Sequence, residues 1–137
     1  LGIKTVKVAC LAAKEKVSEK MPTTVDARKL QEHCEAGGFG PGVIVEGPLA
    51  VDLAISKDAA KVKQFKSEIS GDVDVLMVPT IEVGNGIGKT LTYLAGAESA
   101  GIIMGARVPV VLVSRADSYE AKLYSIALGS VIAGAGK

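Results

Sequence analysis

The sequence predicts an α/β fold, with a mainly parallel sheet and helices on both of its faces. Short β-branched apolar runs alternate with charged segments of helical periodicity, and glycine or proline separates them. Apolar residues make up 48% of the 137 residues and aromatic residues only 4%. This composition favours a tightly packed α/β interior, and the chain is long enough to bury a core.

The first third of the chain predicts two strands joined by a helix. Residues 6–11 and 43–45 are short apolar runs, as expected for strands of a buried sheet. Either Thr23 or Thr24 is expected to open a helix between the strands, which runs to about Glu35 and is closed by Gly37 and Gly38. The sequence Glu-Gly-Pro at residues 46–48 predicts a turn after the second strand.

The middle third predicts two helices and a third strand. Residues 49–56 form a short apolar helix or turn, and Ser56 then caps a surface helix at residues 57–69. A β-branched run at residues 73–78 predicts a strand, which Pro79 ends.

A glycine-rich segment after this strand is the feature around which the chain is organised. Glycines at 84, 86 and 88 predict a turn, and Asn85 is placed to cap the helix that follows. Because free amide groups at a helix amino terminus bind anions, Gly84 and Asn85 are candidate phosphate-binding or substrate-binding residues. The alternative is that the glycines serve only the geometry of the turn.

Two familiar nucleotide-binding motifs do not fit this segment. A Walker loop ending at Gly88-Lys89-Thr90 requires glycine at position 83, which is Val83. A dinucleotide fingerprint requires G-x-G-x-x-G, whereas this segment reads G-x-G-x-G. The sequence therefore disfavours a P-loop nucleotide binder.

The last third predicts two more strands, at residues 100–104 and 108–113, and a closing helix around residues 123–131. Ligands of parallel α/β sheets bind at the carboxyl ends of strands, and Ser114 and Arg115 follow such an end. An arginine there offers a fork for phosphate, and the serine adds a hydroxyl group.

Asp117 and Glu120 are less specific candidates. Their D-x-x-E spacing is that of a capping box at the start of the closing helix. Capping alone therefore explains both carboxylates.

Charge and cysteine content narrow the class of partner. The net charge is +1, with 16 basic and 15 acidic residues spread along the chain, which argues against nucleic-acid or membrane partners and favours small molecules. Cys10 and Cys34 are far apart, so we expect reduced thiols in a cytoplasmic protein and no metal site. The chain starts at Leu1 without a methionine, so we expect a fragment or a processed product.

Three segments resemble a known family. The sequences EGPLAVDLAIS, VDVLMVPTIEVGN and AGIIMGARVPVVLVSRADS, the last followed by EAKLYSIAL, occur in the order and spacing of the phosphate acetyl/butyryltransferase family. The resemblance runs from about residue 6 to residue 127. No single segment is decisive, but three in register are specific.

The resemblance implies a reaction. Family members transfer an acyl group between coenzyme A and inorganic phosphate, so that acyl-CoA and phosphate give acyl phosphate and free CoA. Coenzyme A is then a co-substrate, with no tightly bound cofactor, no metal and no covalent acyl-enzyme. Butyryl-CoA is favoured because SRADS with EAKL is similar to the butyryl-specific members. An acetyl-specific enzyme and a non-catalytic α/β ligand-binding or dimerisation module are the alternatives.

The resemblance also implies an architecture. Family members are roughly twice as long, form homodimers or higher homo-oligomers, and have two α/β domains of the isocitrate/isopropylmalate dehydrogenase-like type around a cleft. Residues 1–106 would be the second domain, and residues 107–137 would return to the first domain, whose amino-terminal part is absent. We therefore expect little activity from this chain alone.

Residue roles follow from the same resemblance. Ser114 and Arg115 match the family pair implicated in holding phosphate and stabilising charge on the tetrahedral intermediate. The family position for a proposed thiol base is Ala121 here, so Asp117 or Glu120 would have to substitute.

The glycine-rich segment carries a second departure from the family pattern. Gly84 and Asn85 match a pair of residues that lies on the cleft side in the family. Thr80 stands where the family usually has an aspartate. Thr80 is the third candidate substrate-binding residue. Glu46 and Asp52 match a further family segment of unassigned role.

Overall fold

The computed structural model describes residues 2–135. Contacts divide them into two compact units, Gly2–Gly84 and residues 85–135, which are described separately. Helix α4 (Ile81–Leu94) runs across the boundary between the units. None of the helices in residues 2–135 is both long enough and apolar enough to span a bilayer.

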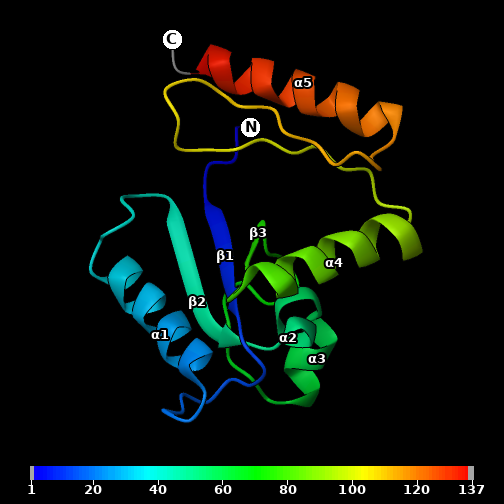
Figure 1. Ribbon diagram of the computed structural model, residues 1–137. Helices are drawn as coiled ribbons and strands as arrows, with labels where there is room; N and C mark the ends of the chain where they lie inside the picture. The colour runs from blue at the N-terminus through cyan, green and yellow to red at the C-terminus, as the bar shows by residue number, and fades with distance from the viewer. Residues whose placement is uncertain (1, 136–137) are drawn as a thin grey trace. The chain divides into compact units, whose positions relative to one another are not determined.

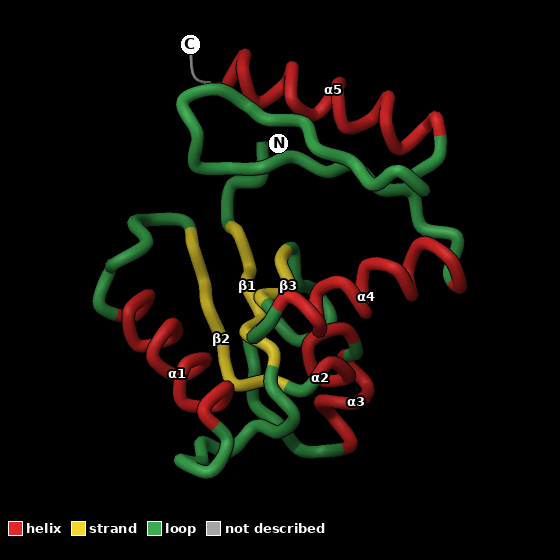
Figure 2. Tube along the Cα trace, in the orientation of Figure 1, coloured by secondary structure: helices red, strands yellow, loops and turns green. Residues whose placement is uncertain are grey.

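The first unit is built on a three-stranded parallel sheet, which confirms the predicted fold class. Its strands β1 (Val6–Leu11), β2 (Val43–Leu49) and β3 (Val75–Met77) stand in the order β2-β1-β3 (Figures 1 and 2). Strand β1 is therefore central, and β2 is an edge strand.

Helices cover both faces of this sheet. Helix α1 (Pro22–Glu35) packs against one face, where Cys10, Ala27 and Val45 form the buried core. The connection from β1 to β2 contains α1, and the connection from β2 passes β1 to reach β3 on its other side. Because these two connections run in opposite directions across the sheet and both are expected to be right-handed, they lie on opposite faces. Helix α2 (Val51–Ile55) belongs to that connection and contacts β1.

Strand β2 continues through residues 46–48, where the sequence predicted a turn. Gly47 explains the difference, because a Cβ atom at this position would lie 2.7 Å from the Cβ of Cys10 and 3.1 Å from that of Ala27. The absence of a side chain at Gly47 therefore lets α1 pack closely against the sheet.

Helix α3 (Lys57–Val62) is capped as predicted but ends early. The Ser56 hydroxyl oxygen accepts a hydrogen bond from the Ala59 amide at 3.1 Å. The helix was expected to reach residue 69. Gln64 instead adopts a φ of 52°, and the Ser67 hydroxyl accepts hydrogen bonds from the amides of Ile69 and Ser70. These local bonds replace the helical ones.

The predicted glycine turn is wrong, because α4 begins at Ile81 and includes all three glycines. The Gly84 amide already donates to the Thr80 carbonyl at 3.1 Å. Asn85 lies inside the helix and does not cap it. Pro79 follows the strand and prevents its continuation. The Thr80 hydroxyl, which lies 3.5 Å from the Val83 amide, occupies the capping position that was predicted for Asn85.

The two strands predicted at residues 100–104 and 108–113 are also absent from the sheet. They meet only at an isolated antiparallel bridge, in which the Ile103 amide donates to the Val110 carbonyl at 2.8 Å. No third segment of residues 2–135 pairs with them. Without a neighbouring strand, the backbone amide and carbonyl groups of an apolar run cannot form the hydrogen bonds of a β-sheet.

The closing helix is confirmed as α5 (Tyr119–Ala135). Its buried positions are the small residues Ala121, Ser125 and Gly129, which follow one helical face. The Ser125 hydroxyl accepts from the Gly101 amide at 2.9 Å and donates to the Ala121 carbonyl. This contact ties α5 to the bridged segments. Residues 136 and 137, which close the predicted 107–137 segment, lie outside the described residues.

Candidate substrate site

Residues 114–117 form a tight turn in the second unit. The Ser114 amide donates to Oδ2 of Asp117 at 2.7 Å, and the Asp117 amide donates back to the Ser114 carbonyl at 3.1 Å. The Ser114 hydroxyl accepts from the Ala116 amide at 3.3 Å. Ser114 and Asp117 therefore hold each other, and the sequence did not foresee this pairing.

Arg115 stands within this turn. Its side chain is exposed, and among residues 2–135 it forms no ion pair. A guanidinium with no carboxylate partner keeps all of its donors available for an anionic ligand. The turn thus fixes the backbone of Arg115, whose guanidinium has no acidic partner among the described residues.

The predicted capping box is displaced by one residue. Ser118 caps α5, because its hydroxyl oxygen accepts from the Ala121 amide at 3.1 Å. Asp117 is instead committed to the Ser114 amide. Glu120 lies exposed in the first turn of α5, where a negative charge is favoured.

A cavity of about 380 Å³ adjoins the turn and lies wholly within the second unit. Asp117 and Glu120 both line it, whereas Ser114 and Arg115 do not. Tyr124 also lines it and donates its hydroxyl to Glu98 at 3.2 Å. The negative charge of Glu98 raises the pKa of Tyr124. The other lining residues are Thr92, Tyr93, Ala97, Ser99, Ala116, Ser118 and Ala121.

The substrate-binding candidates near the start of α4 have local structural roles. Thr80 begins the helix, and its hydroxyl lowers the pKa of the Glu82 carboxyl through a hydrogen bond. Gly84 lets the helix pass Val78, because an added Cβ would lie 3.0 Å from that side chain. Asn85 is exposed on the helix. The amide groups that the glycine turn was expected to offer to an anion are thus used within the helix.

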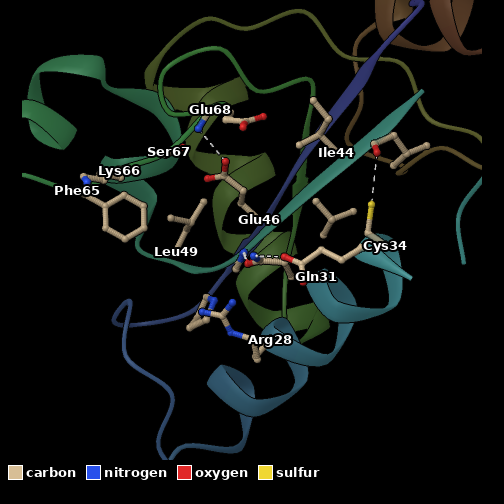
Figure 3. Close-up of a pocket in the computed structure, with 15 residues that line it drawn as sticks. Arg28, Gln31, Cys34, Ile44, Glu46, Leu49, Phe65, Lys66, Ser67 and Glu68 are labelled. Carbon is tan, nitrogen blue, oxygen red and sulfur yellow. Dashed lines mark hydrogen bonds between the residues drawn. The ribbon is translucent and has the colours of Figure 1, made fainter. Parts of the chain in front are cut away.

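A larger groove of about 970 Å³ lies in the first unit, along the outer edge of β2 (Figure 3). Gln31 and Cys34 of α1 reach this edge: Oε1 of Gln31 accepts from the Gly47 amide at 3.0 Å, and the Cys34 thiol donates to the Val43 carbonyl at 3.3 Å. Sequence reasoning missed this groove. Only Glu46, Gly47 and Pro48 hinted at it, through the family segment. It is lined by Arg28, Gln31, Cys34, Glu35, residues 43–49 and residues 65–68.

The two acidic residues of that family segment differ in their surroundings. Oε1 of Glu46 accepts from the Glu68 amide at 2.8 Å, so its carboxylate ties the groove wall to β2 (Figure 3). Asp52 pairs with Lys63 at 2.8 Å, and this hydrogen bond lowers the pKa of the Asp52 carboxyl. Both carboxylates therefore have a structural partner. The described residues contain no cluster of three His, Cys, Asp or Glu side chains able to hold a metal ion.

Comparison with known proteins places the chain in a family. The family model for phosphate acetyl/butaryl transferase matches residues 1–130. The chain belongs to the phosphate acetyl/butyryltransferase family. This confirms the resemblance seen in the three sequence segments.

Two relatives of this family and one solved structure show how much of such a protein the chain spans. It is 45% identical to the phosphate butyryltransferase of Clostridium acetobutylicum over 134 residues, which is 98% of the chain and 44% of that protein. It is 47% identical to the phosphate acetyltransferase of Thermotoga maritima, covering 97% of the chain and 45% of that protein. A branched-chain phosphotransacylase from Enterococcus faecalis V583 superimposes with a TM-score of 0.85 at 41% identity, over 94% of this chain and 46% of its own.

The chain thus spans less than half the length of these phosphate acyltransferase relatives. Butyryl- and acetyl-specific relatives match at nearly equal identity. Family membership therefore does not distinguish between butyryl and acetyl groups.

Proposed function

We propose that this chain carries part of the active site of a phosphate acyltransferase, which exchanges an acyl group between coenzyme A and inorganic phosphate. The observation that carries the proposal is the Ser114–Asp117 turn, which holds Arg115 within a family segment, without an ion-pair partner among residues 2–135. Acyl-CoA and phosphate are the substrates, and the enzyme needs no tightly bound cofactor.

The chemistry of the exchange suits an arginine at this position. The CoA thiolate forms a bond to the carbonyl carbon of the acyl phosphate, the carbon–oxygen bond to phosphate breaks, and phosphate leaves with the electron pair. Negative charge develops on the carbonyl oxygen and then on phosphate, and a fixed guanidinium stabilises both. The Ser114 hydroxyl adds a donor beside it.

Asp117 acts through Ser114 in this proposal, because its carboxylate is bonded to the Ser114 amide. Glu120 lines the adjacent cavity and is the better-placed candidate to accept the thiol proton. A dedicated base is not essential, because a thiol of pKa about 8.5 is already ionised to a few per cent at neutral pH. Thr80, Gly84 and Asn85 stay proposed substrate contacts through their side chains or backbone carbonyls.

Butyryl-CoA is the acyl donor that we favour, and acetyl-CoA is the alternative. Support for butyryl transfer comes from the segment SRADS followed by EAKL. Turnover of both thioesters by one preparation decides between them.

We also propose that residues 1–106 form the second domain of a longer architecture and that residues 107–137 return to its first domain. Support comes from residues 108–113. Apart from the single bridge between Ile103 and Val110, this apolar run pairs with no strand of residues 2–135, and the side chains of Val108 and Leu112 are 66% and 70% exposed. A sheet of the first domain would supply the missing neighbours, and coenzyme A would bind in the cleft between the domains.

A fusion protein tests these proposals together. The part of the Clostridium acetobutylicum relative that precedes its matching segment is joined to this chain, and acyl transfer is measured with butyryl-CoA and acetyl-CoA. The fusion should be active, whereas the 137-residue chain alone should show little or no transfer. Full-rate transfer by the chain alone would overturn the domain proposal. A folded but inactive fusion would favour the alternative, a non-catalytic ligand-binding or dimerisation module.

A further inference from the structure

The cavity of about 380 Å³ in the second unit follows the first two turns of α5. Asp117 and Ser118 line it where the helix begins, Ala121 lines it one turn later, and Tyr124 lies about one turn beyond Ala121. Asp117 also closes the turn that carries Arg115, so this end of the cavity adjoins the position proposed for phosphate. The cavity therefore extends from that turn toward Tyr124.

Residues 97–99 supply another part of the lining, and hydrogen bonds hold this segment to α5. The Tyr124 hydroxyl donates to Oε1 of Glu98 at 3.2 Å. The Gly101 amide donates to Oγ of Ser125 at 2.9 Å, and Ser125 is only 1% exposed. Contacts within the second unit therefore fix both sides of the cavity and the ring of Tyr124.

The charge of the lining excludes the anionic parts of the proposed substrates. Glu98, Asp117 and Glu120 are acidic, and no lysine or arginine of the described residues lines the cavity. These carboxylates repel inorganic phosphate and the phosphate groups of coenzyme A. Only a neutral part of the substrates suits this cavity.

Most polar side chains of the lining are already bonded within the chain. They are Thr92, Glu98, Asp117, Ser118 and Tyr124. The apolar part of the lining consists of the methyl groups of Ala97, Ala116 and Ala121 and the ring of Tyr124. The pantetheine arm of coenzyme A carries amide groups, which need hydrogen-bond partners when they are buried, whereas a hydrocarbon chain needs none. The lining therefore suits the chain of the acyl group better than the arm.

We propose that this cavity receives the hydrocarbon chain of the acyl group, and that Ala121 and Tyr124 determine its length. The inference rests on the proposed function, because it takes the reacting carbonyl to lie beside Arg115. The small side chain of Ala121 leaves room for the chain along α5, and the ring of Tyr124 ends that space. A butyryl group has two more methylene groups than an acetyl group, and their burial favours butyryl transfer.

Two substitutions in the fusion protein change the length of the cavity in opposite directions. Ala121→Leu fills the space along α5 and should lower the ratio of kcat/KM for butyryl-CoA to that for acetyl-CoA at least tenfold. Tyr124→Ala removes the end of the cavity and should raise the ratio for hexanoyl-CoA over butyryl-CoA about tenfold. Each ratio is measured on one preparation, so a partly unfolded variant gives the same ratio as a fully folded one.

Two further variants accompany this pair. Ala97→Leu narrows the cavity from an exposed position outside α5, so it gives a result even if Ala121→Leu does not fold. It should lower the same butyryl-to-acetyl ratio. Tyr119→Ala is the matched control for Tyr124→Ala, because Tyr119 is 74% exposed in the same helix and does not line the cavity. It should leave every ratio unchanged.

The outcomes separate this inference from the proposed function. Transfer with chain-length ratios that do not respond to the substitutions at Ala121, Ala97 and Tyr124 would overturn the inference alone. An equal loss with every thioester would also overturn it, and would assign the cavity to the arm of coenzyme A. A wild-type fusion that accepts only acetyl-CoA would contradict it as well. A wild-type fusion that transfers no acyl group would contradict the proposed function, and the inference with it.

Discussion

Ser114 and Asp117 hold one another through two hydrogen bonds, from the Ser114 amide to Oδ2 of Asp117 at 2.7 Å and from the Asp117 amide to the Ser114 carbonyl at 3.1 Å. The carboxylate closes the turn that carries Arg115. In the proposed transfer we therefore expect Asp117 to act as a positioning residue, with Glu120 preferred as the base.

Replacing Asp117 should loosen this turn. We expect Asp117→Ala in the fusion protein to lower kcat/KM for acyl transfer about tenfold, because Arg115 loses its fixed placement. The free energy of unfolding should fall by only about 0.5–1.5 kcal/mol, the usual worth of one hydrogen bond. Asp117→Asn keeps an acceptor oxygen and should retain most of the activity. An inactive Asn variant together with an unchanged turn would instead point to a proton-transfer role.

Removing the Arg115 guanidinium should have a larger effect. We expect Arg115→Ala in the fusion protein to reduce kcat by about 10² or more, by analogy with the loss of one donor to a developing oxyanion. Arg115→Lys should recover part of the loss, since it restores charge without the bidentate fork. Arg107→Ala, at another exposed arginine, is the control. An unchanged rate in Arg115→Ala would reject the proposed role.

The glycines of α4 offer a test of helix against turn. A Cβ added at Gly86 or Gly88 meets nothing within 4 Å. Gly86→Ala and Gly88→Ala should each raise the free energy of unfolding by up to about 1 kcal/mol, because alanine favours a helix interior. Gly84→Ala should gain less, since its Cβ would lie 3.0 Å from Val78. Destabilisation by all three substitutions, measured by urea unfolding, would argue for a turn.

Gly47 should not tolerate a side chain. We expect Gly47→Ala to lower the free energy of unfolding by about 1–3 kcal/mol, because the new methyl group would lie 2.7 Å from the Cβ of Cys10 in β1 and 3.1 Å from that of Ala27 in α1, and both would have to move. A double variant with Cys10→Gly removes that clash and should recover part of the loss. A neutral Gly47→Ala would show that β1 and α1 can both shift to make room for the methyl group.

Burial makes the Cys10 thiol slow to react. Its side chain is 2% exposed, and desolvation raises its pKa to about 11 from the ordinary 9.0. In a Cys34→Ser variant, a thiol reagent at pH 8 should label Cys10 only as fast as the chain unfolds. Native labelling as rapid as labelling in denaturant would contradict this burial.

The same shift gives a pH dependence. The unfolded thiol ionises near pH 9, whereas the folded thiol stays protonated until about pH 11. Its contribution to stability is therefore complete below pH 9 and is lost as the pH rises through the folded value. A Cys10→Ala variant should show a shallower fall in unfolding free energy between pH 9 and pH 11.

Elements defined by local signals were predicted well. Strand β1 and helices α1 and α5 appear where apolar periodicity and flanking glycine or proline placed them, and Ser56 caps α3. Ser114, Arg115, Asp117 and Glu120 were named as candidates from residue type and family pattern, and their roles stay predictions. Their arrangement was not predicted, because the bond between Asp117 and the Ser114 amide competes with a capping role that the sequence favours equally.

The sequence by itself determined the α/β class, the parallel order of strand and helix, and the family, since these depend on hydrophobic period and on residues near one another in the chain. Tertiary structure decided the rest. Gly47, which the sequence placed in a turn, lies in strand β2, where it packs closely on Cys10. Residues 108–113, which the sequence placed in a strand, join no sheet because no neighbouring strand is present in residues 2–135. Both outcomes depend on distant atoms, because a backbone group is satisfied only by whatever partner the fold brings to it.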